Sequence, residues 1–179
     1  MKLFRIFAEL KIQKREMAET RRTTRVPKAT KTKPVDEYGH LQPQAPELEE
    51  AVLGALMIEK DAYSLVSEIL RPESFYEHRN QLIYAAITDL AIQQKPIDIL
   101  TVTEQLRSRG DLDEVGGPFY ITQLSGKVAS SAHIEYHARI IAQKFLAREL
   151  ISFTSNMQTK AFDETQDVDD LMQEAEGKL

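Results

Sequence analysis

The feature that most constrains this fold is a run from about Ala132 to Phe162 that contains neither proline nor glycine. Apolar side chains recur along it at helical spacing, which predicts one continuous α-helix. At about 1.5 Å per residue, the helix is about 45 Å long, which exceeds the width of a small domain. The rest of the chain can therefore cover only part of it.

Shorter helices are predicted on both sides of this run. One begins at Pro46, where a missing N–H costs nothing. A second carries Leu65, Val66, Ile69 and Leu70 and stops before Pro72. A third runs from about His78 to Gln94. Asp167 is expected to cap the last helix, with acidic residues in its first turn.

Two further short helices are marked by capping residues and glycines. Thr101 and Glu104 match the capping box, with a hydroxyl at the cap and a carboxylate three residues later, and Gly110 closes that helix. The next follows Gly116-Gly117-Pro118 and ends at Gly126. Because no strand pattern occurs, the sequence predicts an all-α fold: a compact multi-helix body followed by a long helical hairpin.

Charge and composition divide the chain into three parts. Residues 1–36 hold eleven Lys or Arg against four acids, a net +7, and the remainder carries −12, which together give the chain's −5. Residues 17–45 have too little apolar periodicity to offset ordering entropy. We therefore predict a basic disordered arm over 1–45, a helical body over 46–127, and over 128–179 a hairpin that leads to a linker. Met17-Ala18-Glu19-Thr20 resembles a natural start, so residues 1–16 are expected to derive from an upstream start codon.

Composition also excludes several classes of protein. The chain has no cysteine, which excludes disulfides and thiolate metal sites. No apolar run approaches the ~18 residues that a membrane-spanning helix needs. These features favour a cytoplasmic location.

No arrangement of residues indicates catalysis, a metal site or a cofactor site. A P-loop needs Gly-x-x-x-x-Gly-Lys-Ser/Thr, but Gly126-Lys127 is followed by Val128. His133 and His137 share a helical face that could hold zinc, but the glutamate of the metalloprotease pattern is missing after His133. We interpret both as surface or interface histidines. The acidic pairs Glu49-Glu50 and Asp169-Asp170 do not face each other and suit the first turn of a helix.

The long helix carries more apolar side chains than it can leave in water. Each side chain left in water would lose roughly 1.5–3 kcal/mol of stabilisation from burial. Added over all of them, this loss would exceed the ~5–15 kcal/mol stability of a typical domain. We predict self-association or a partner interface; in the alternative, the hairpin folds back over residues 46–125. The predicted interface residues are Ile134, Tyr136, Ile140, Ile141, Phe145, Leu146, Leu150, Phe153 and Met157. On this view, Ile141→Asp lowers the oligomeric mass and leaves helicity intact.

The basic arm suits sequence-independent attraction to phosphates, which would be salt-dependent. Residues 17–36 contain no aromatic side chain on which bases could stack. In the alternative, the arm only keeps the chain soluble. The candidate phosphate contacts are Arg21, Arg22, Arg25, Lys28, Lys31 and Lys33.

Several segments, taken in order, resemble one family. The run Glu49-Glu50-Ala51-Val52-Leu53-Gly54-Ala55-Leu56-Met57 resembles the opening helix of the N-terminal domain of DnaB-type replicative helicases, although most members have Ala-Glu at its first two positions. The further matching segments are Phe75-Tyr76, His78-Arg79, Ile83-Tyr84, Pro96-Ile97-Asp98-Ile99-Leu100-Thr101-Val102, Val115-Gly116-Gly117, Tyr120-Ile121, Ser130-Ser131-Ala132-His133-Ile134, Arg139-Ile140-Ile141 and Arg148-Glu149-Leu150. The resemblance covers about residues 43–179.

The resemblance implies a non-catalytic assembly domain in DNA replication. Members of the family dimerise through the hairpin, form a hexamer as a trimer of dimers, and dock the C-terminal domain of primase in the primosome. A helicase loader is a further possible partner. In the family, a linker leads to a RecA-like motor that uses Mg-ATP to unwind DNA; this chain lacks the motor, and no cofactor is expected in it. We interpret the chain as an excised domain or a truncated gene product. The alternatives are a stand-alone helicase-binding adaptor or loader-like protein, and a nucleic-acid-binding module that uses the basic arm.

Overall fold

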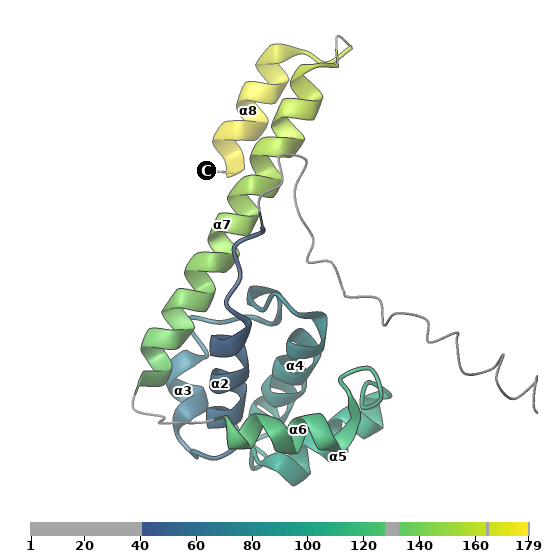
Figure 1. Ribbon diagram of the computed structural model, residues 1–179. Coiled ribbons are helices and arrows are strands. Elements are labelled where there is room, and N and C mark those ends of the chain that lie inside the picture. The colour runs from purple at the N-terminus through teal and green to yellow at the C-terminus, as the bar shows by residue number, and fades with distance from the viewer. Residues whose placement is uncertain (1–40, 128–132, 164, 179) are drawn as a thin grey trace, which may run out of the picture. The chain divides into compact units, whose positions relative to one another are not determined.

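The computed structural model describes residues 41–127, 133–163 and 165–178, and its elements in these ranges are helices joined by turns and loops (Figure 1). Its elements, in order, are α2 (Pro46–Leu56), α3 (Ala62–Val66), the 3-10 turn η1 (Pro72–Ser74), α4 (His78–Ile92), α5 (Ile99–Arg109), α6 (Gly117–Gly126), α7 (Ile134–Ala161) and α8 (Val168–Lys178). No strand occurs in these ranges, and the predicted all-α fold is confirmed. None of the described helices is both long enough and apolar enough to cross a membrane.

Residues from Gln42 onward form one compact unit. The predicted boundary between body and hairpin falls at the edge of residues 128–132, outside the described ranges, and it stays a prediction. The predicted arm over 1–45 lies almost entirely outside them.

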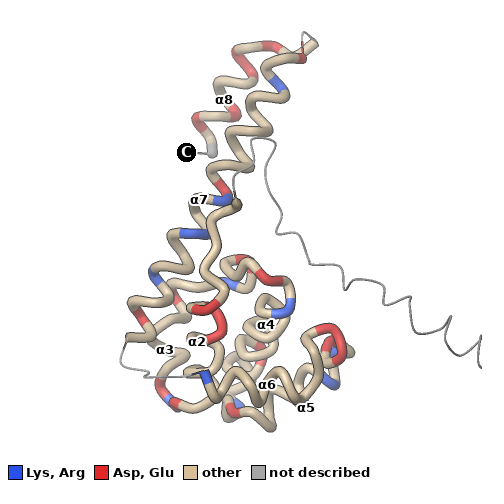
Figure 2. The backbone as a smooth tube through the Cα atoms, in the orientation of Figure 1, with Lys and Arg blue, Asp and Glu red and all other residues tan. Residues whose placement is uncertain are grey.

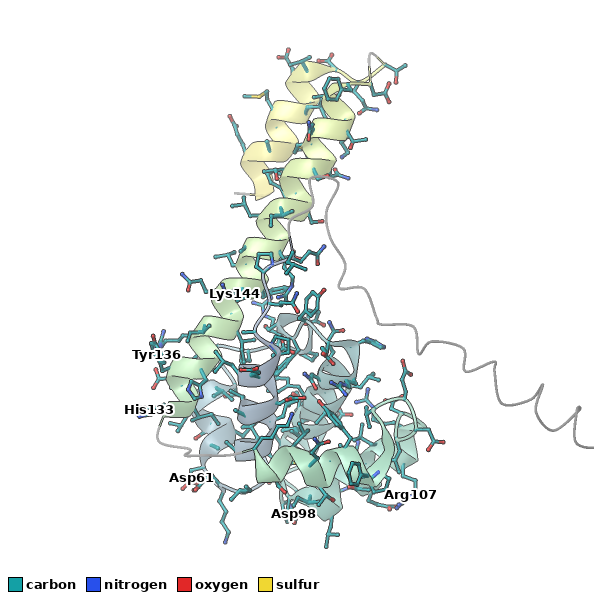
Figure 3. The ribbon with its side chains drawn as sticks, in the orientation of Figure 1. Asp61, Asp98, Arg107, His133, Tyr136 and Lys144 are labelled. Atoms are coloured by element: carbon teal, nitrogen blue, oxygen red, sulfur yellow. The ribbon has the colours of Figure 1, made fainter. Side chains whose placement is uncertain are left out.

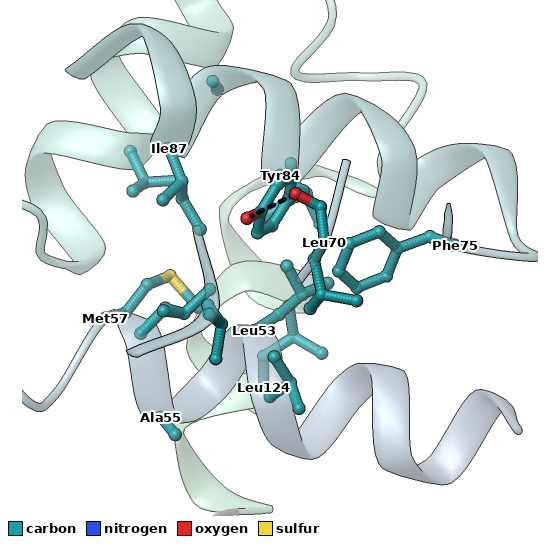
Figure 4. Packing of buried hydrophobic residues seen from close by; sticks show 14 of the residues in the cluster. Leu53, Ala55, Met57, Leu70, Phe75, Tyr84, Ile87 and Leu124 are labelled. Atoms are coloured by element: carbon teal, nitrogen blue, oxygen red, sulfur yellow. Dashed lines mark hydrogen bonds between the residues drawn. The ribbon is translucent and has the colours of Figure 1, made fainter. Parts of the chain in front are cut away.

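Helix α2 is the centre of the core. It packs against α3, α4, α6 and α7, and its Val52, Leu53 and Leu56 are at most 1% exposed. Figure 4 shows how residues from other elements close around it; the rings of Phe75 and Tyr84 are 5.0 Å apart. Among the described α-helices, only α8 adds no buried residue to this cluster. The body is therefore built around α2, and α8 takes no part in its core.

Helix α7 confirms the predicted long helix, with 28 residues between its bounds. Its first half packs on α2 and α3 and buries Ile134, Ala138 and Ile141, spaced four and three residues apart. Its second half packs with α8, where Lys160 Nζ lies 2.6 Å from a Glu174 carboxylate oxygen. A single helix thus belongs to the body at one end and to the hairpin at the other.

Two local predictions were wrong. The N-cap of α5 is Asp98: its carboxylate accepts the N–H groups of Leu100 and Thr101, and Thr101 Oγ1 accepts the N–H of Asp98. A carboxylate that accepts two amides is a stronger cap than the predicted Thr101 hydroxyl, so the helix begins three residues earlier. The predicted second helix ends at Val66, and the chain continues to the buried Leu70 as hydrogen-bonded turns.

Glycines end or begin helices where the sequence indicated. Gly110 closes α5 with φ 82°. Gly116 precedes α6 with φ 100°, and a Cβ at this position would lie 3.2 Å from Tyr120 Cβ. Both the left-handed backbone and this close approach therefore favour glycine at 116.

Candidate assembly interface

The second half of α7 presents a row of apolar side chains that the body does not cover. Leu146, Leu150, Phe153 and Met157 recur every three or four residues and so share one side of the helix. Leu146 is 69% exposed and Leu150 is 54% exposed. Phe153 and Met157 are half-buried.

A groove of about 720 Å³ runs along this row, between α7 and α8. It is lined by Leu146, Glu149, Leu150, Ser152, Phe153, Asn156, Lys160 and Glu174. Three of these residues are apolar, and the other five are polar or charged. We call this surface the hairpin groove. Exposed apolar side chains grouped among polar ones are typical of a surface that binds another protein.

Charge is distributed unevenly in the hairpin (Figure 2). Helix α8 carries four acidic residues, Asp169, Asp170, Glu174 and Glu176, against one basic residue, Lys178, so it is negatively charged. The ion pair between Lys160 and Glu174 joins the two helices, and both side chains are about one-third exposed (35% and 33%). A pair this exposed contributes no more than about 1 kcal/mol, so apolar contacts must hold most of the hairpin together.

The structure brings together only some of the nine predicted interface residues. Leu146, Leu150 and Phe153 line the hairpin groove, and Met157 is on the same side of α7. Ile140 and Phe145 are half-buried, and Tyr136, which is 65% exposed, lies on the side of α7 away from the body (Figure 3).

Two of the nine were wrongly assigned to a surface. Ile134 is 3% exposed and Ile141 is 1% exposed, because both pack into the body's own core. The proposed Ile141→Asp test fails for the same reason, since this substitution places a charge in the core.

Sequence reasoning missed the polar half of the groove. Asn156 and Lys160 follow Phe153 at three- and four-residue intervals, and this helical spacing could have identified them. Glu174 comes from another helix, so only the packing of α8 reveals it. The six candidate phosphate contacts, Arg21 to Lys33, lie outside the described residues. His133 precedes α7 and His137 is in its first turn, and the described residues contain no cluster of three or more metal-ligating side chains.

The paired acids Glu49 and Glu50 belong to a buried polar network that the sequence did not indicate. Glu49 is 1% exposed, and its carboxylate accepts the N–H of Tyr76 at 2.7 Å and the side-chain amide of Asn80 at 3.0 Å. Glu50 pairs with Lys127 and with the hydroxyl of Tyr120. Because both carboxylates are held by hydrogen bonds from other elements, their role is structural.

Tyr120 completes this network. Its hydroxyl lies 3.1 Å from Asn80 Oδ1 and 3.2 Å from Glu50 Oε1, and the Arg79 guanidinium is 4.2 Å from its ring centroid. Burial raises the pKa of Tyr120 well above its ordinary value; Arg79 lowers it, and Glu50 raises it further. The hydroxyl therefore stays protonated and can donate a hydrogen bond to either acceptor.

Comparison with known sequences places the chain among parts of replicative helicases. The family model described as "DnaB-like helicase N terminal domain" matches residues 41–143. The replicative DNA helicase DnaB of Rhodothermus marinus is 45% identical over 141 residues, which are 79% of this chain and 15% of that protein. The replicative DNA helicase DnaC of Bacillus subtilis is 39% identical over 136 residues, which are 76% of this chain and 30% of that protein. The chain thus spans less than a third of either relative.

Solved structures agree with these matches. The crystal structure of the N-terminal domain of DnaB helicase from Mycobacterium tuberculosis superposes with a TM-score of 0.72 and 35% identity, and the match covers 75% of this chain and 95% of that one. A DnaB-like replicative helicase, solved to show its interactions with primase, superposes with a TM-score of 0.63 and 25% identity over 74% of this chain and 30% of that one. The chain belongs to the family of DnaB-like helicase N-terminal domains.

Proposed function

We propose that this domain is the non-catalytic assembly and primase-docking part of an ATP-dependent replicative DNA helicase. The observation that carries the proposal is the hairpin groove, where the exposed apolar side chains of Leu146 and Leu150 lie in a domain of this family. Burying Leu146 and Leu150 against a partner would contribute roughly 1.5–3 kcal/mol each. A repeated, self-complementary surface of this kind builds dimers, and dimers can then close into a ring.

The proposed mechanism is scaffolding. Six copies in a ring hold their partners at one place, which raises the effective concentration of each partner at the replication fork. We propose the C-terminal domain of primase as the principal partner, because a similar helicase was solved with its interactions with primase. A helicase loader is a second proposed partner. Mg-ATP would be used by the motor of the whole helicase.

The basic arm supports a further, weaker proposal. A net charge of +7 over residues 1–36 would attract the phosphates of DNA without sequence preference. A fluorescence titration with single-stranded DNA, repeated from 50 to 200 mM salt, tests this. Affinity should fall steeply with salt, and an affinity that does not change with salt would contradict the proposal.

The assembly proposal is tested by the solution mass of the full chain, measured by size-exclusion chromatography with light scattering over a range of concentrations. We expect dimers in equilibrium with hexamers. Leu150→Asp should lower the mass while circular dichroism stays unchanged, because the side chain is already 54% exposed in the single chain. Leu100→Asp is the matched control, since Leu100 is 80% exposed but lies on α5 in the body.

A wild-type chain that stays monomeric at every concentration would contradict the assembly role and favour the adaptor alternative. If dimers and hexamers form, calorimetric titration with the C-terminal domain of primase comes next. We expect saturable binding, and no heat of binding to the assembled chain would contradict the docking role.

A further inference from the structure

Arg148 lies at the point where α7 leaves the body. Its guanidinium donates from Nη1 to the carbonyl oxygen of Pro43 and from Nη2 to that of Ser74, each at 2.8 Å. Pro43 precedes α2, and Ser74 ends η1. One side chain therefore joins α7 to two segments that are far from it, and from each other, in the sequence.

The guanidinium also lies between two aromatic rings. Its central carbon is 5.5 Å from the ring centroid of Tyr76 and 5.7 Å from that of Phe145. Burial lowers the pKa of Arg148, whereas the nearby Glu49, Tyr76 and Glu149 raise it. An arginine side chain remains charged in such a setting, so both hydrogen bonds are charge-assisted.

Arg148 also marks the limit of the contact between α7 and the body. The last fully buried residue of α7 is Ile141, and no residue of α7 beyond Arg148 is fully buried. The direction of the second half thus depends on few contacts. About 13 further residues form a lever of about 20 Å, so a tilt of about 15° at Arg148 would move the end of α7 by about 5 Å.

The junction is otherwise incompletely satisfied. Among the described residues, the side-chain nitrogen of Gln44 and the hydroxyl of Tyr76 are buried and find no hydrogen-bond partner. Each belongs to a residue that adjoins or contacts the Arg148 site. Arg148 therefore supplies hydrogen bonds at a junction where two other buried polar groups supply none.

We propose that Arg148 is a positioning residue that sets the direction in which the hairpin leaves the body, and so the geometry with which the hairpin groove meets a second copy. The effect on how the hairpin groove meets a second copy rests on the assembly role proposed above. The direction of the hairpin is a property of the single chain. The planar guanidinium of Arg148 donates to two separate carbonyls at once. It therefore restrains α7 against both tilt and rotation, which a single hydrogen bond cannot do.

The direction of the hairpin can be measured with two spin labels. The chain has no cysteine, so Gln123→Cys on α6 and Gln158→Cys on α7 add the only thiols. Both positions are exposed. The doubly labelled full chain is diluted in an excess of unlabelled chain, so that pulsed electron paramagnetic resonance reports distances within one molecule.

We expect a narrow distance distribution for the unsubstituted background and a distribution several ångströms broader for Arg148→Gln. Arg148→Lys should lie between them, because an ammonium keeps the charge but lacks the fork. Arg139→Gln is the matched control: it removes an arginine from the same helix, and Arg139 is exposed and, within the described part of the chain, pairs with Glu135 of α7 alone. That control should keep the narrow distribution.

An unchanged distribution for Arg148→Gln would overturn the proposal, as would equal broadening by Arg139→Gln. If circular dichroism shows that Arg148→Gln does not fold, Arg148→Lys decides: a broader distribution supports the positioning role, and an unchanged one overturns it. The solution mass is a separate readout. A broadened distribution in a chain that never assembles would uphold the positioning role and reject the proposed function.

Discussion

The body and the hairpin use apolar residues in opposite ways. In the body, α2 buries Val52, Leu53 and Leu56 almost completely. In the hairpin, α7 carries Leu146 and Leu150 at the same helical spacing and leaves both more than half exposed. The body is therefore stabilised by its own side chains, and the hairpin still has apolar area to bury when a partner arrives.

Their polar groups differ in the same way. Glu49 is buried and accepts hydrogen bonds from two other segments, whereas Lys160 and Glu174 pair where water reaches both. One chain therefore combines a body in which single substitutions should strongly lower stability with a hairpin in which they should have small effects.

The largest expected effect on stability concerns the packing of α7 against the body. Ile141→Asp should lower the free energy of unfolding by about 4 kcal/mol or more, because an unpaired charge would replace a fully buried side chain. Ile151→Asp, on the same helix at a position 44% exposed, should cost less than about 1 kcal/mol in the single chain. Urea denaturation of both variants measures the difference. Equal costs would mean that α7 does not dock on the body through Ile141.

The next effect concerns the buried carboxylate. Glu49→Ala should lower the free energy of unfolding by about 3 kcal/mol, because the N–H of Tyr76 and the side-chain amide of Asn80 would lose their acceptor. The control is Glu47→Ala in the same first turn, where the exposed side chain should be worth no more than about 0.5 kcal/mol. The two variants are compared by urea denaturation at neutral pH, and a Glu49→Ala chain as stable as the control would remove the network from the body's stability.

A smaller effect should appear at alkaline pH. Burial raises the pKa of Tyr84 and of Tyr120 well above the ordinary value of 10.0. A raised pKa in the folded state means that stability is fully present below about pH 10 and falls as the pH rises further, by up to about 1.4 kcal/mol per pH unit for each tyrosine. Urea midpoints between pH 9 and 11.5 should show this fall. Tyr120→Phe should reduce its slope, and an unchanged slope would contradict the role assigned to Tyr120.

The smallest effect lies in the turn between α7 and α8. Asp163 accepts both the N–H and the hydroxyl of Thr165, and these hydrogen bonds lower the pKa of Asp163 below its ordinary 3.8. A lowered pKa means that the turn's contribution is present above about pH 4 and is lost as the pH falls through the folded-state value. Asp163→Asn should speed hydrogen exchange at the Thr165 amide without a measurable change in global unfolding. A shifted urea midpoint would show that the turn is coupled to the body.

Much of the candidate site was visible in the sequence, but its polarity and its limits were not. The spacing of Leu146, Leu150 and Phe153 predicted that they share a surface, and the groove contains all three. Ile134 and Ile141 fitted the same helical pattern and lie in the core. Nothing in the pattern separates the two sets, because which side of α7 is covered depends on α2 and α3, far away in the sequence.

Local signals in the sequence located most of the helices, although α5 begins earlier and α3 ends earlier than they predicted. Pro46, Gly110 and the uninterrupted run that forms α7 act through interactions within one or two turns, so local chemistry was enough to predict them. The long-range contacts could be seen only in the packed fold: Glu49 accepts the N–H of Tyr76, and Arg148 donates to the carbonyls of Pro43 and Ser74. Those contacts join residues between 27 and 105 positions apart, and they form only after the core has brought the helices together.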